Sequence, residues 1–264
     1  MAKIIAVCNQ KGGVGKTTTS INLAACLAAA ERKTLIVDMD AQSNATTGLG
    51  IDKGSVELSM YDVITEREVD GHPVEIRDIR QTVDYMKFLD VAPATPDLAG
   101  AEIELVNTMA REYRLRSALQ AISDEYDYII IDSPPSLGLV TVNVLTAATS
   151  VLIPIQCEYY ALEGLAELLN TVRQVQKNLN PKLVIEGALL TMYDGRLSLS
   201  REVAEDVRSC FSGRVFNVVI SRNVRLSEAP SFGKPIILYN IMSAGAENYL
   251  TLAKEVMDNE QNTK

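Results

Sequence analysis

The chain has 264 residues, 47% of them hydrophobic, which is enough for one sizeable core, and we expect a single domain over residues 1–264. Twenty-five basic residues against thirty-four acidic ones give a net charge of −9, which excludes a general attraction of the whole surface to nucleic acid or anionic lipid. Binding to either would have to use a local patch.

Short apolar, β-branched runs alternate with longer helical patterns along the chain. The expected strands are 4–7, 34–37, 88–91, 128–131, 151–155, 184–190 and 215–220. The expected helices are 18–30, one opened by Thr95, Pro96 and Asp97, 110–122, 162–179, 199–211 and 246–257. This alternation predicts an α/β fold with one doubly wound, mostly parallel sheet flanked by helices. Residues 51–81 are expected as an excursion on the sheet and residues 258–264 as a frayed tail.

A glycine-rich loop, KGGVGKTT, joins the first strand to the first helix. Glycines at three positions let backbone N–H groups turn inward around phosphate oxygens, where a Cβ would obstruct the turn or the approach. Strand, loop and helix together predict a P-loop that binds ATP with Mg²⁺. The residues expected to contact the nucleotide here are Lys11, Gly12, Gly13, Val14, Gly15, Lys16, Thr17 and Thr18.

Three side chains are expected to act on the phosphates and their metal ion. Lys16 supplies a positive charge beside the helix N-terminus, and the Thr17 hydroxyl is the expected magnesium ligand. Asp132 ends the apolar strand 128–131, which is the Walker B arrangement that holds the hydrated magnesium ion. Thr18 can add a contact to the α-phosphate.

Asp38 and Asp40 follow the second strand, two residues apart. Strand pleating would point both carboxylates to one face at the carboxyl edge of the sheet, where α/β proteins bind ligands. One can serve magnesium and the other water, and either could instead cap the following turn.

The loop opens with Lys11, which is unusual at this position. This deviant Walker A loop resembles that of the ATPases that include the ParA partitioning proteins, the MinD division-site proteins and the nitrogenase iron protein. The resemblance implies that Lys11 crosses the interface of a nucleotide-sandwich homodimer to the partner's phosphates. A second cation supplied from another subunit would make dimerisation and catalysis one event.

Five stretches covering essentially the whole chain resemble the short chromosomal ParA proteins of the Soj type: NQKGGVGKTTTSINLA, VDMDAQSNATTGLG, ATPDLAGAEIELV, YDYIIIDSPPSLGLVTVNVLTA and RNVRLSEAPSFGKPIILYN. The resemblance implies that Asp40 positions the attacking water and that residues 41–50 sense the γ-phosphate. It also implies that Ser221 and Asn223 lie at the adenine, although Ser221 replaces a proline found in many relatives.

Residues 196–234 form a candidate DNA-binding segment, with six arginines and Lys234 against four acidic residues, a net charge of +3. Sequence-independent DNA binding needs arginines that face phosphates and weakens steeply with salt. Composition alone favours a solvated arginine-bearing face, whereas the resemblance implies DNA contacts by Arg196 and Arg225, with Arg222 as a neighbouring candidate.

Other members of the superfamily fit the sequence less well. Nitrogenase-like redox chemistry needs cluster cysteines, but the four cysteines form no paired motif, and His72 is the only histidine. A MinD-like protein needs a basic amphipathic C-terminal helix, whereas helix 246–257 has Lys254 among acidic residues and a stripe expected to be core. We therefore expect no membrane partner. The members of the stripe are Leu250, Ala253, Val256 and Met257.

The sequence thus predicts an ATP-dependent DNA-partitioning ATPase, cytoplasmic and associated with the nucleoid. By resemblance, the ATP-bound homodimer binds DNA non-specifically, and a ParB-type centromere-binding protein stimulates the hydrolysis that releases it. The alternatives are a MinD-like positioning ATPase that acts on a membrane or protein complex, and a metabolic P-loop enzyme.

Overall fold

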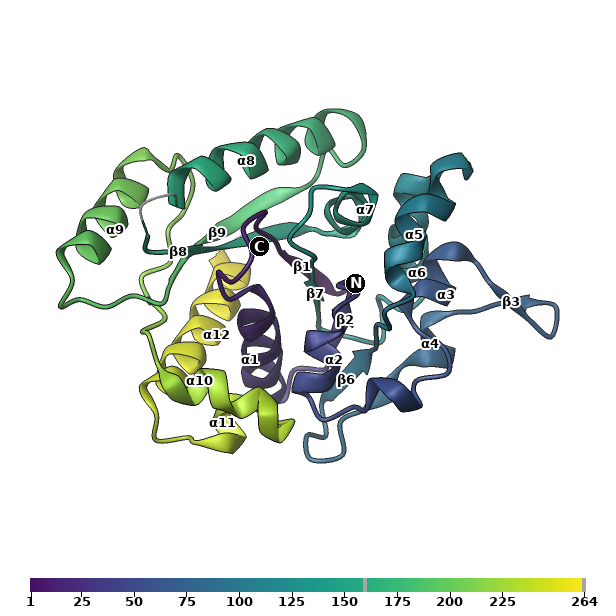
Figure 1. Ribbon diagram of the computed structural model, residues 1–264, viewed down its shortest axis with the longest axis horizontal. Coiled ribbons are helices and arrows are strands. Elements are labelled where there is room, and N and C mark those ends of the chain that lie inside the picture. Colours follow the sequence, from purple (N-terminus) through teal and green to yellow (C-terminus); the bar gives the residue numbers. More distant parts are fainter. Residues whose placement is uncertain (159–160, 263–264) are drawn as a thin grey trace.

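A seven-stranded sheet runs through the centre of the computed structural model, which describes residues 1–158 and 161–262 (Figure 1). The strand order is β5-β6-β2-β7-β1-β8-β9, and every neighbouring pair is parallel except β5 and β6. The doubly wound, mostly parallel sheet expected from the sequence is confirmed. The bounds are β1 Lys3–Val7, β2 Thr34–Asp38, β5 Gln81–Thr82, β6 Leu89–Ala92, β7 Tyr128–Asp132, β8 Ser150–Gln156 and β9 Val184–Thr191.

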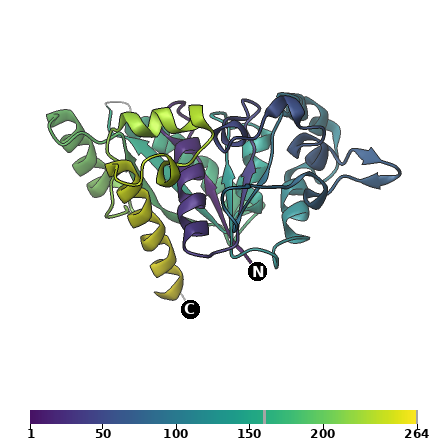
Figure 2. The same cartoon turned by 90° about the horizontal axis from the view of Figure 1, so that it is seen from below.

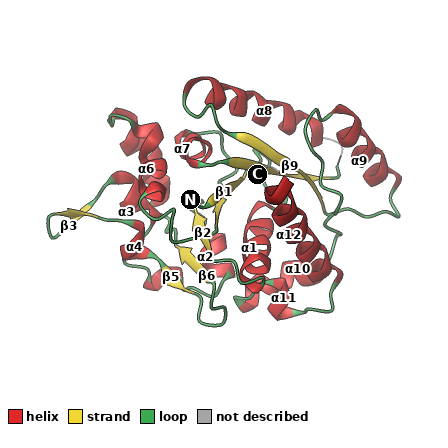
Figure 3. Cartoon of the chain, turned by 180° about the vertical axis from the view of Figure 1, so that it is seen from behind, coloured by secondary structure: helices red, strands yellow, loops and turns green. Residues whose placement is uncertain are grey.

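Helices cover both faces of this sheet and bury two separate apolar cores. One face is covered by α3 Met60–Thr65, α5 Leu98–Glu104, α6 Arg114–Gln120, α7 Leu139–Ala147, α8 Ala161–Asn178 and α9 Ser198–Cys210. The other is covered by α1 Lys16–Ala29, α2 Asn44–Gly48, α10 Val224–Glu228, α11 Ile236–Tyr239 and α12 Ala244–Asn262 (Figures 1 and 3). Strands β2 and β7 are buried along their full length, which explains the apolar runs at residues 35–37 and 128–131 within them.

The strand order brings the carboxyl ends of β1, β2 and β7 close together at one edge of the sheet. β1, which leads into α1, lies between β7 and β8, and β7 lies between β1 and β2. The register pairs Val7 with Asp132 and Asp132 with Asp38, so the three strand ends are level. Because parallel strands end at the same edge, the loop after β1 meets the carboxylates after β2 and β7 there.

Residues 51–81 leave the body of the sheet and return to its edge. They contain the short helix η1 Lys53–Ser55, α3, the hairpin of β3 Glu68–Val69 and β4 His72–Pro73, and α4 Ile76–Ile79. The hairpin projects outward from the molecule (Figure 2).

The expected strand 215–220 is wrong. That segment forms no continuous ladder with β9: Val215 makes an isolated bridge with Ala188, and the amides of Phe216 and Ile220 donate to the carbonyl oxygens of Ala188 and Leu190. The amides of Asn217 and Val218 donate instead to the Glu255 carboxylate on α12, at 3.1 and 2.8 Å. A long-range carboxylate therefore takes the donors that a strand ladder would use.

Two helix expectations also need correction. The expected helix 110–122 begins only at Arg114, because Ala110 has a left-handed φ of 53° and a 3₁₀ turn, η3 Arg111–Tyr113, follows it. Helix α12 continues to Asn262, where fraying was expected, and its Leu250, expected in the core, is 42% exposed. No helix among the described residues combines the length and apolar character needed to cross a membrane.

Candidate nucleotide site

The loop between β1 and α1 borders a cavity of about 330 Å³ at the carboxyl edge of the sheet. Gly13 and Gly15 have φ values of 75° and 87°, a region that only glycine adopts without strain, and Gly15 is the N-cap of α1. The backbone amides that open α1 therefore border this cavity. Its lining residues are Gly12, Gly13, Gly15, Lys16, Thr17, Thr18, Asp40, Gln42, Asn44, Pro135 and Met192.

Lys16 brings a buried positive charge to the phosphate cavity. The residue is 7% exposed, and its Nζ donates a hydrogen bond to the Lys11 carbonyl oxygen at 3.1 Å. Burial lowers the pKa of Lys16, with Asp132 as the largest opposing influence. A desolvated ammonium in a cavity gains more from an anionic ligand than an exposed one does, which fits a phosphate.

Thr17, Ser20 and Asp132 form a hydrogen-bonded group at the start of α1. The Thr17 and Ser20 hydroxyls donate to the two carboxylate oxygens of Asp132, each at 2.8 Å. Burial, followed by the nearby charge of Asp38, raises the pKa of Asp132 to about 7. The Thr17 hydroxyl and the Asp132 carboxylate form an oxygen donor set of the kind that Mg²⁺ prefers. Because the charged form of Asp132 is unfavourable in this buried place, a bound cation would stabilise it.

Asp38 and Asp40 do not share one role in the structure. Asp38 is fully buried, and its carboxylate accepts hydrogen bonds from the Thr46 amide and hydroxyl at 2.9 and 2.7 Å, and from the Asp40 amide at 3.1 Å. Asp40 lines the phosphate cavity. The pleating argument does not extend to both residues, because β2 ends at Asp38 and the chain turns through Ser43, whose φ is 57°. Asp38 thus anchors residues 41–50, and its placement does not favour a magnesium role.

Lys11 is not among the residues that line the phosphate cavity. Its Nζ lies 3.4 Å from Glu158 Oε2, with the two side chains 36% and 46% exposed. The Lys11 amide donates to Asn9 Oδ1 at 3.0 Å, which holds the start of the loop. Lys11 is accordingly at the surface and held by a weak, solvent-exposed ion pair.

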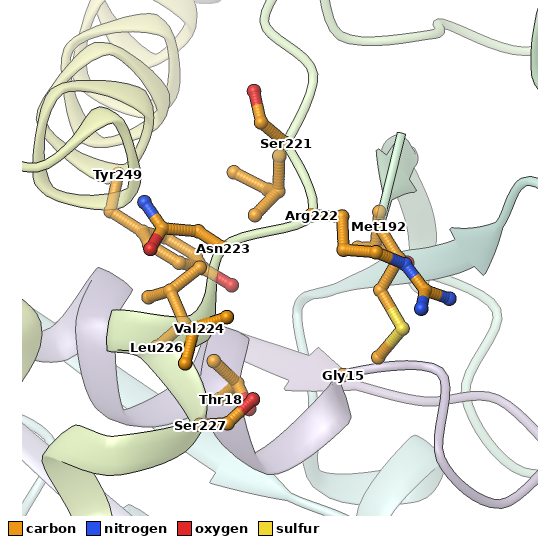
Figure 4. A pocket seen from close by; sticks show the side chains of 12 residues that line it. Gly15, Thr18, Met192, Ser221, Arg222, Asn223, Val224, Leu226, Ser227 and Tyr249 are labelled. Carbon is orange, nitrogen blue, oxygen red and sulfur yellow. The ribbon is translucent and has the colours of Figure 1, made fainter. Parts of the chain in front are cut away.

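A second cavity, of about 280 Å³, adjoins the first through Gly15 and Thr18 (Figure 4). Asn223 lies in it beside Tyr249, and its Oδ1 caps α10 by accepting from the Arg225 amide at 2.9 Å. Its side-chain NH₂ can therefore donate to a base edge. The lining residues are Gly15, Thr18, Thr191, Met192, Ile220, Ser221, Arg222, Asn223, Val224, Leu226, Ser227 and Tyr249.

Comparison with known proteins identifies the family. A family model described as an AAA domain matches residues 2–185. The chain is 61% identical to the sporulation initiation inhibitor protein Soj of Bacillus subtilis, over 98% of this chain and 100% of the relative. It is 56% identical to the chromosome partitioning protein ParA of Myxococcus xanthus, over 97% of this chain and 88% of the relative. The chain belongs to the ParA/Soj family.

A solved structure supports the same fold for this ParA/Soj protein. The chain resembles cobyrinic acid a,c-diamide synthase from Mycobacterium smegmatis with bound ADP and magnesium, with a TM-score of 0.86 and 36% identity. The match covers 100% of this chain and 97% of the other. A nucleotide and magnesium are therefore bound by a protein of this fold.

The three arginines that the ParA/Soj resemblance suggested for DNA occupy different settings. The Arg196 side chain is 89% exposed and forms a bidentate ion pair with Asp194, with N–O distances of 2.9 and 2.7 Å. This pair lowers the pKa of Asp194 to about 2. Arg225 pairs with Glu228 at 2.7 Å. Arg222 lines the second cavity beside Met192 (Figure 4). Both Arg196 and Arg225 are thus paired with a local carboxylate, and Asp194, which lies outside residues 196–234, offsets part of the net positive charge of that segment.

Several residues that build this ParA/Soj site escaped the sequence analysis. Ser20 had a local signal, since it lies three residues after Thr17 on the same helix face. Thr46 and Glu158 had none, because their partners Asp38 and Lys11 are fixed only by the tertiary fold.

Proposed function

We propose that this chain is an ATP-dependent DNA-partitioning ATPase whose ATP-bound homodimer binds DNA non-specifically and is released after hydrolysis. The observation that carries the proposal is the combination of a phosphate cavity that contains the buried Lys16 with a second lysine, Lys11, which lies outside the cavity lining and is partly exposed. Full-length identity to the Soj and ParA relatives supports the partitioning role.

ATP binding would use both cavities, with phosphates at Lys16 and the base near Asn223. Thr17 and Asp132 would hold Mg²⁺, which when bound neutralises charge on the phosphate oxygens. Asp40 lies in the phosphate lining, where its carboxylate can orient a water molecule toward the terminal phosphate. Each of these side chains performs binding or orientation, which is most of what phosphoryl transfer to water requires from a protein.

Dimerisation would complete the site through Lys11. Its ammonium is partly exposed and, among the described residues, pairs with Glu158, so a partner's phosphates can capture it at small cost. In a two-fold symmetric sandwich each chain would give one lysine and receive one. ATP would then act as the bridge between chains, and loss of the γ-phosphate would weaken the dimer.

DNA binding would use Arg196 and Arg225, with the nucleoid as the cellular surface. Both arginines are exposed and paired with one carboxylate each, so DNA phosphates would exchange for Asp194 and Glu228. By family resemblance, a ParB-type centromere-binding protein would stimulate hydrolysis and make the cycle directional.

Cosedimentation with plasmid DNA tests the proposal. Wild-type protein with a non-hydrolysable ATP analogue should pellet with DNA, and this binding should decline steeply with salt. The variant Arg196→Ala plus Arg225→Ala should lose binding, whereas the control Arg32→Ala plus Arg173→Ala, which removes two exposed arginines elsewhere, should keep it. Equal binding by the two variants would refute the arginine assignment. Absence of ATP-dependent DNA binding by the wild type, together with binding to anionic vesicles, would favour a membrane-acting positioning ATPase.

A further inference from the structure

Two glycines from distant segments touch through their backbones. Gly50 and Gly233 have φ values of 83° and 61°. A Cβ placed on Gly233 would lie 2.6 Å from Gly50 Cα and 3.0 Å from Gly50 N, and one on Gly50 would lie 3.1 Å from the Gly233 carbonyl oxygen. A Cβ on Gly233 would clash with the backbone of Gly50, and a Cβ on Gly50 would require Gly233 to shift by a few tenths of an ångström. A movement of one segment is therefore passed to the other without a flexible side chain between them.

The Tyr85 hydroxyl bridges the same two segments. Its oxygen lies 2.9 Å from the Leu49 carbonyl oxygen and 2.8 Å from the Gly233 carbonyl oxygen. Burial raises the pKa of Tyr85 to about 12, so the hydroxyl keeps its proton at neutral pH. A phenol has one proton and donates to one carbonyl oxygen at a time. Tyr85 can therefore alternate between the Leu49 and Gly233 carbonyl oxygens only while the two segments stay in contact.

Gly50 belongs to the segment that borders the phosphates. Gln42 and Asn44 line the phosphate cavity, and α2 runs from Asn44 to Gly48, just before Leu49 and Gly50. Thr46, in the middle of α2, is tied to the buried Asp38 carboxylate and to the Ala94 amide. A ligand that draws Gln42 or Asn44 toward the terminal phosphate position would therefore shift α2 about this anchor and displace Gly50.

Gly233 belongs to the segment that borders the base cavity and carries Arg225. It ends the short helix η4 Ala229–Phe232, which continues directly from α10. Asn223, at the start of α10, lines the base cavity. The α10–η4 segment, residues 223–233, is thus reached from both ends of a bound nucleotide: directly at the base, and through Gly50 at the phosphates.

We propose that the Gly50–Gly233 contact, bridged by Tyr85, couples occupancy of the γ-phosphate position to the placement of α10 and hence of Arg225. Gly50, Tyr85 and Gly233 act as positioning residues. The proposal rests on the proposed function for the role of Arg225, but the coupling itself concerns only this chain. ADP would engage α10 through the base alone, whereas ATP would engage it through both routes.

Tyr85→Phe and Gly50→Ala test the coupling. Tyr85→Phe removes only the bridging hydroxyl, and its control is Tyr61→Phe, whose hydroxyl bonds Glu104 on the surface. Gly50→Ala forces a Cβ into the contact. Its control is Gly71→Ala, since Gly71 has a φ of 80° with no atom of residues 1–158 and 161–262 within 4 Å of its Cβ position, and so matches the backbone strain alone.

Two readouts are compared for ADP and a non-hydrolysable ATP analogue: amide hydrogen exchange of residues 223–233, and DNA affinity. In the wild type and both controls, the analogue should slow exchange in this segment relative to ADP and strengthen DNA binding. The ratio of DNA affinity with the analogue to DNA affinity with ADP should fall about fivefold in Tyr85→Phe, as loss of one hydrogen bond gives. This ratio should also fall in Gly50→Ala, where the added Cβ forces the two segments to shift. Affinity for the analogue should stay within about twofold in Tyr85→Phe, since its hydroxyl touches neither cavity.

The outcomes separate this coupling from the proposed function. Nucleotide-dependent exchange in the wild type that persists unchanged in both variants would overturn the coupling, as would equal exchange with ADP and the analogue in the wild type. Exchange that behaves as expected while no protein binds DNA would sustain the coupling and contradict the DNA role. If the difference between ADP and the analogue decreased as much in the controls as in the variants, the glycines and the tyrosine would have a purely structural role, and the proposal would be overturned.

Discussion

The ionised Asp132 carboxylate lowers the free energy of unfolding of the protein. Replacing Asp132 by asparagine should therefore stabilise the nucleotide-free chain. Burial and the neighbouring Asp38 raise the pKa of Asp132 from 3.8 to about 7. A shift of this size disfavours the ionised folded state by on the order of 4 kcal/mol. Asparagine removes the charge but keeps one oxygen for Thr17 or Ser20, so it forfeits one hydrogen bond, worth about 1 kcal/mol. At pH 8 the net gain for Asp132→Asn should be roughly 3 kcal/mol.

The gain should depend on pH in a defined direction. Between pH values of about 4 and 7 the folded wild type retains a proton that the unfolded chain has lost, so wild-type stability falls as pH rises through this window. Above about pH 7 both states are ionised and the penalty is constant. The advantage of Asp132→Asn should therefore grow by about 2–3 kcal/mol between pH 5 and pH 8.

Thermal unfolding at these two pH values, with and without Mg-ATP, measures the effect. Without nucleotide, Asp132→Asn should melt roughly 6–10 °C above the wild type at pH 8. Mg-ATP should raise the wild-type Tm and leave that of the variant nearly unchanged, because the variant lacks the carboxylate that we propose holds the metal ion. A variant that melts below the wild type at pH 8, or a difference that is the same at both pH values, would refute this account of Asp132.

Two further predictions follow from the segment after β2. Thr46→Val removes a hydroxyl that donates to the buried Asp38 at 2.7 Å, and should lower the free energy of unfolding by about 1–3 kcal/mol in urea titrations; no change would mean that Asp38 is held in another way. Asp40→Ala should keep ATP binding and accumulate a dimer on size exclusion with ATP, while hydrolysis falls by at least about 100-fold; a monomer under these conditions would contradict the role of ATP as a bridge.

The phosphate loop could be read from the sequence because its determinants are local. The positive φ values at Gly13 and Gly15 and the hydroxyl of Thr17 at the start of α1 follow from residues adjacent in the chain. The central strands were equally readable, since a strand buried on both faces must be apolar throughout. Asp132 followed from the end of one such strand.

Features set by distant residues could not be read in this way. Within segment 215–220 the amides of Asn217 and Val218 bond Glu255, about forty residues later, and so interrupt the ladder despite an apolar, β-branched sequence. Asp38 and Asp40 diverge because the strand ends between them, and strand pleating holds only within a strand. The Glu158 partner of Lys11 and the contact between Gly50 and Gly233 exist only once the chain has folded.

The central claim is that Lys11 completes the site of another chain, and hydrolysis by mixed variants tests it most directly. Lys11→Ala and Asp40→Ala should each be inactive alone. In a mixed dimer, the site on the Lys11→Ala chain keeps Asp40 and receives Lys11 from its partner. If the two variants are combined before ATP is added, random pairing should restore about a quarter of the wild-type rate, because half of the dimers carry one complete site. A mixture as inactive as its components would contradict the account, since a lysine acting within its own chain gives no complete site in any pairing.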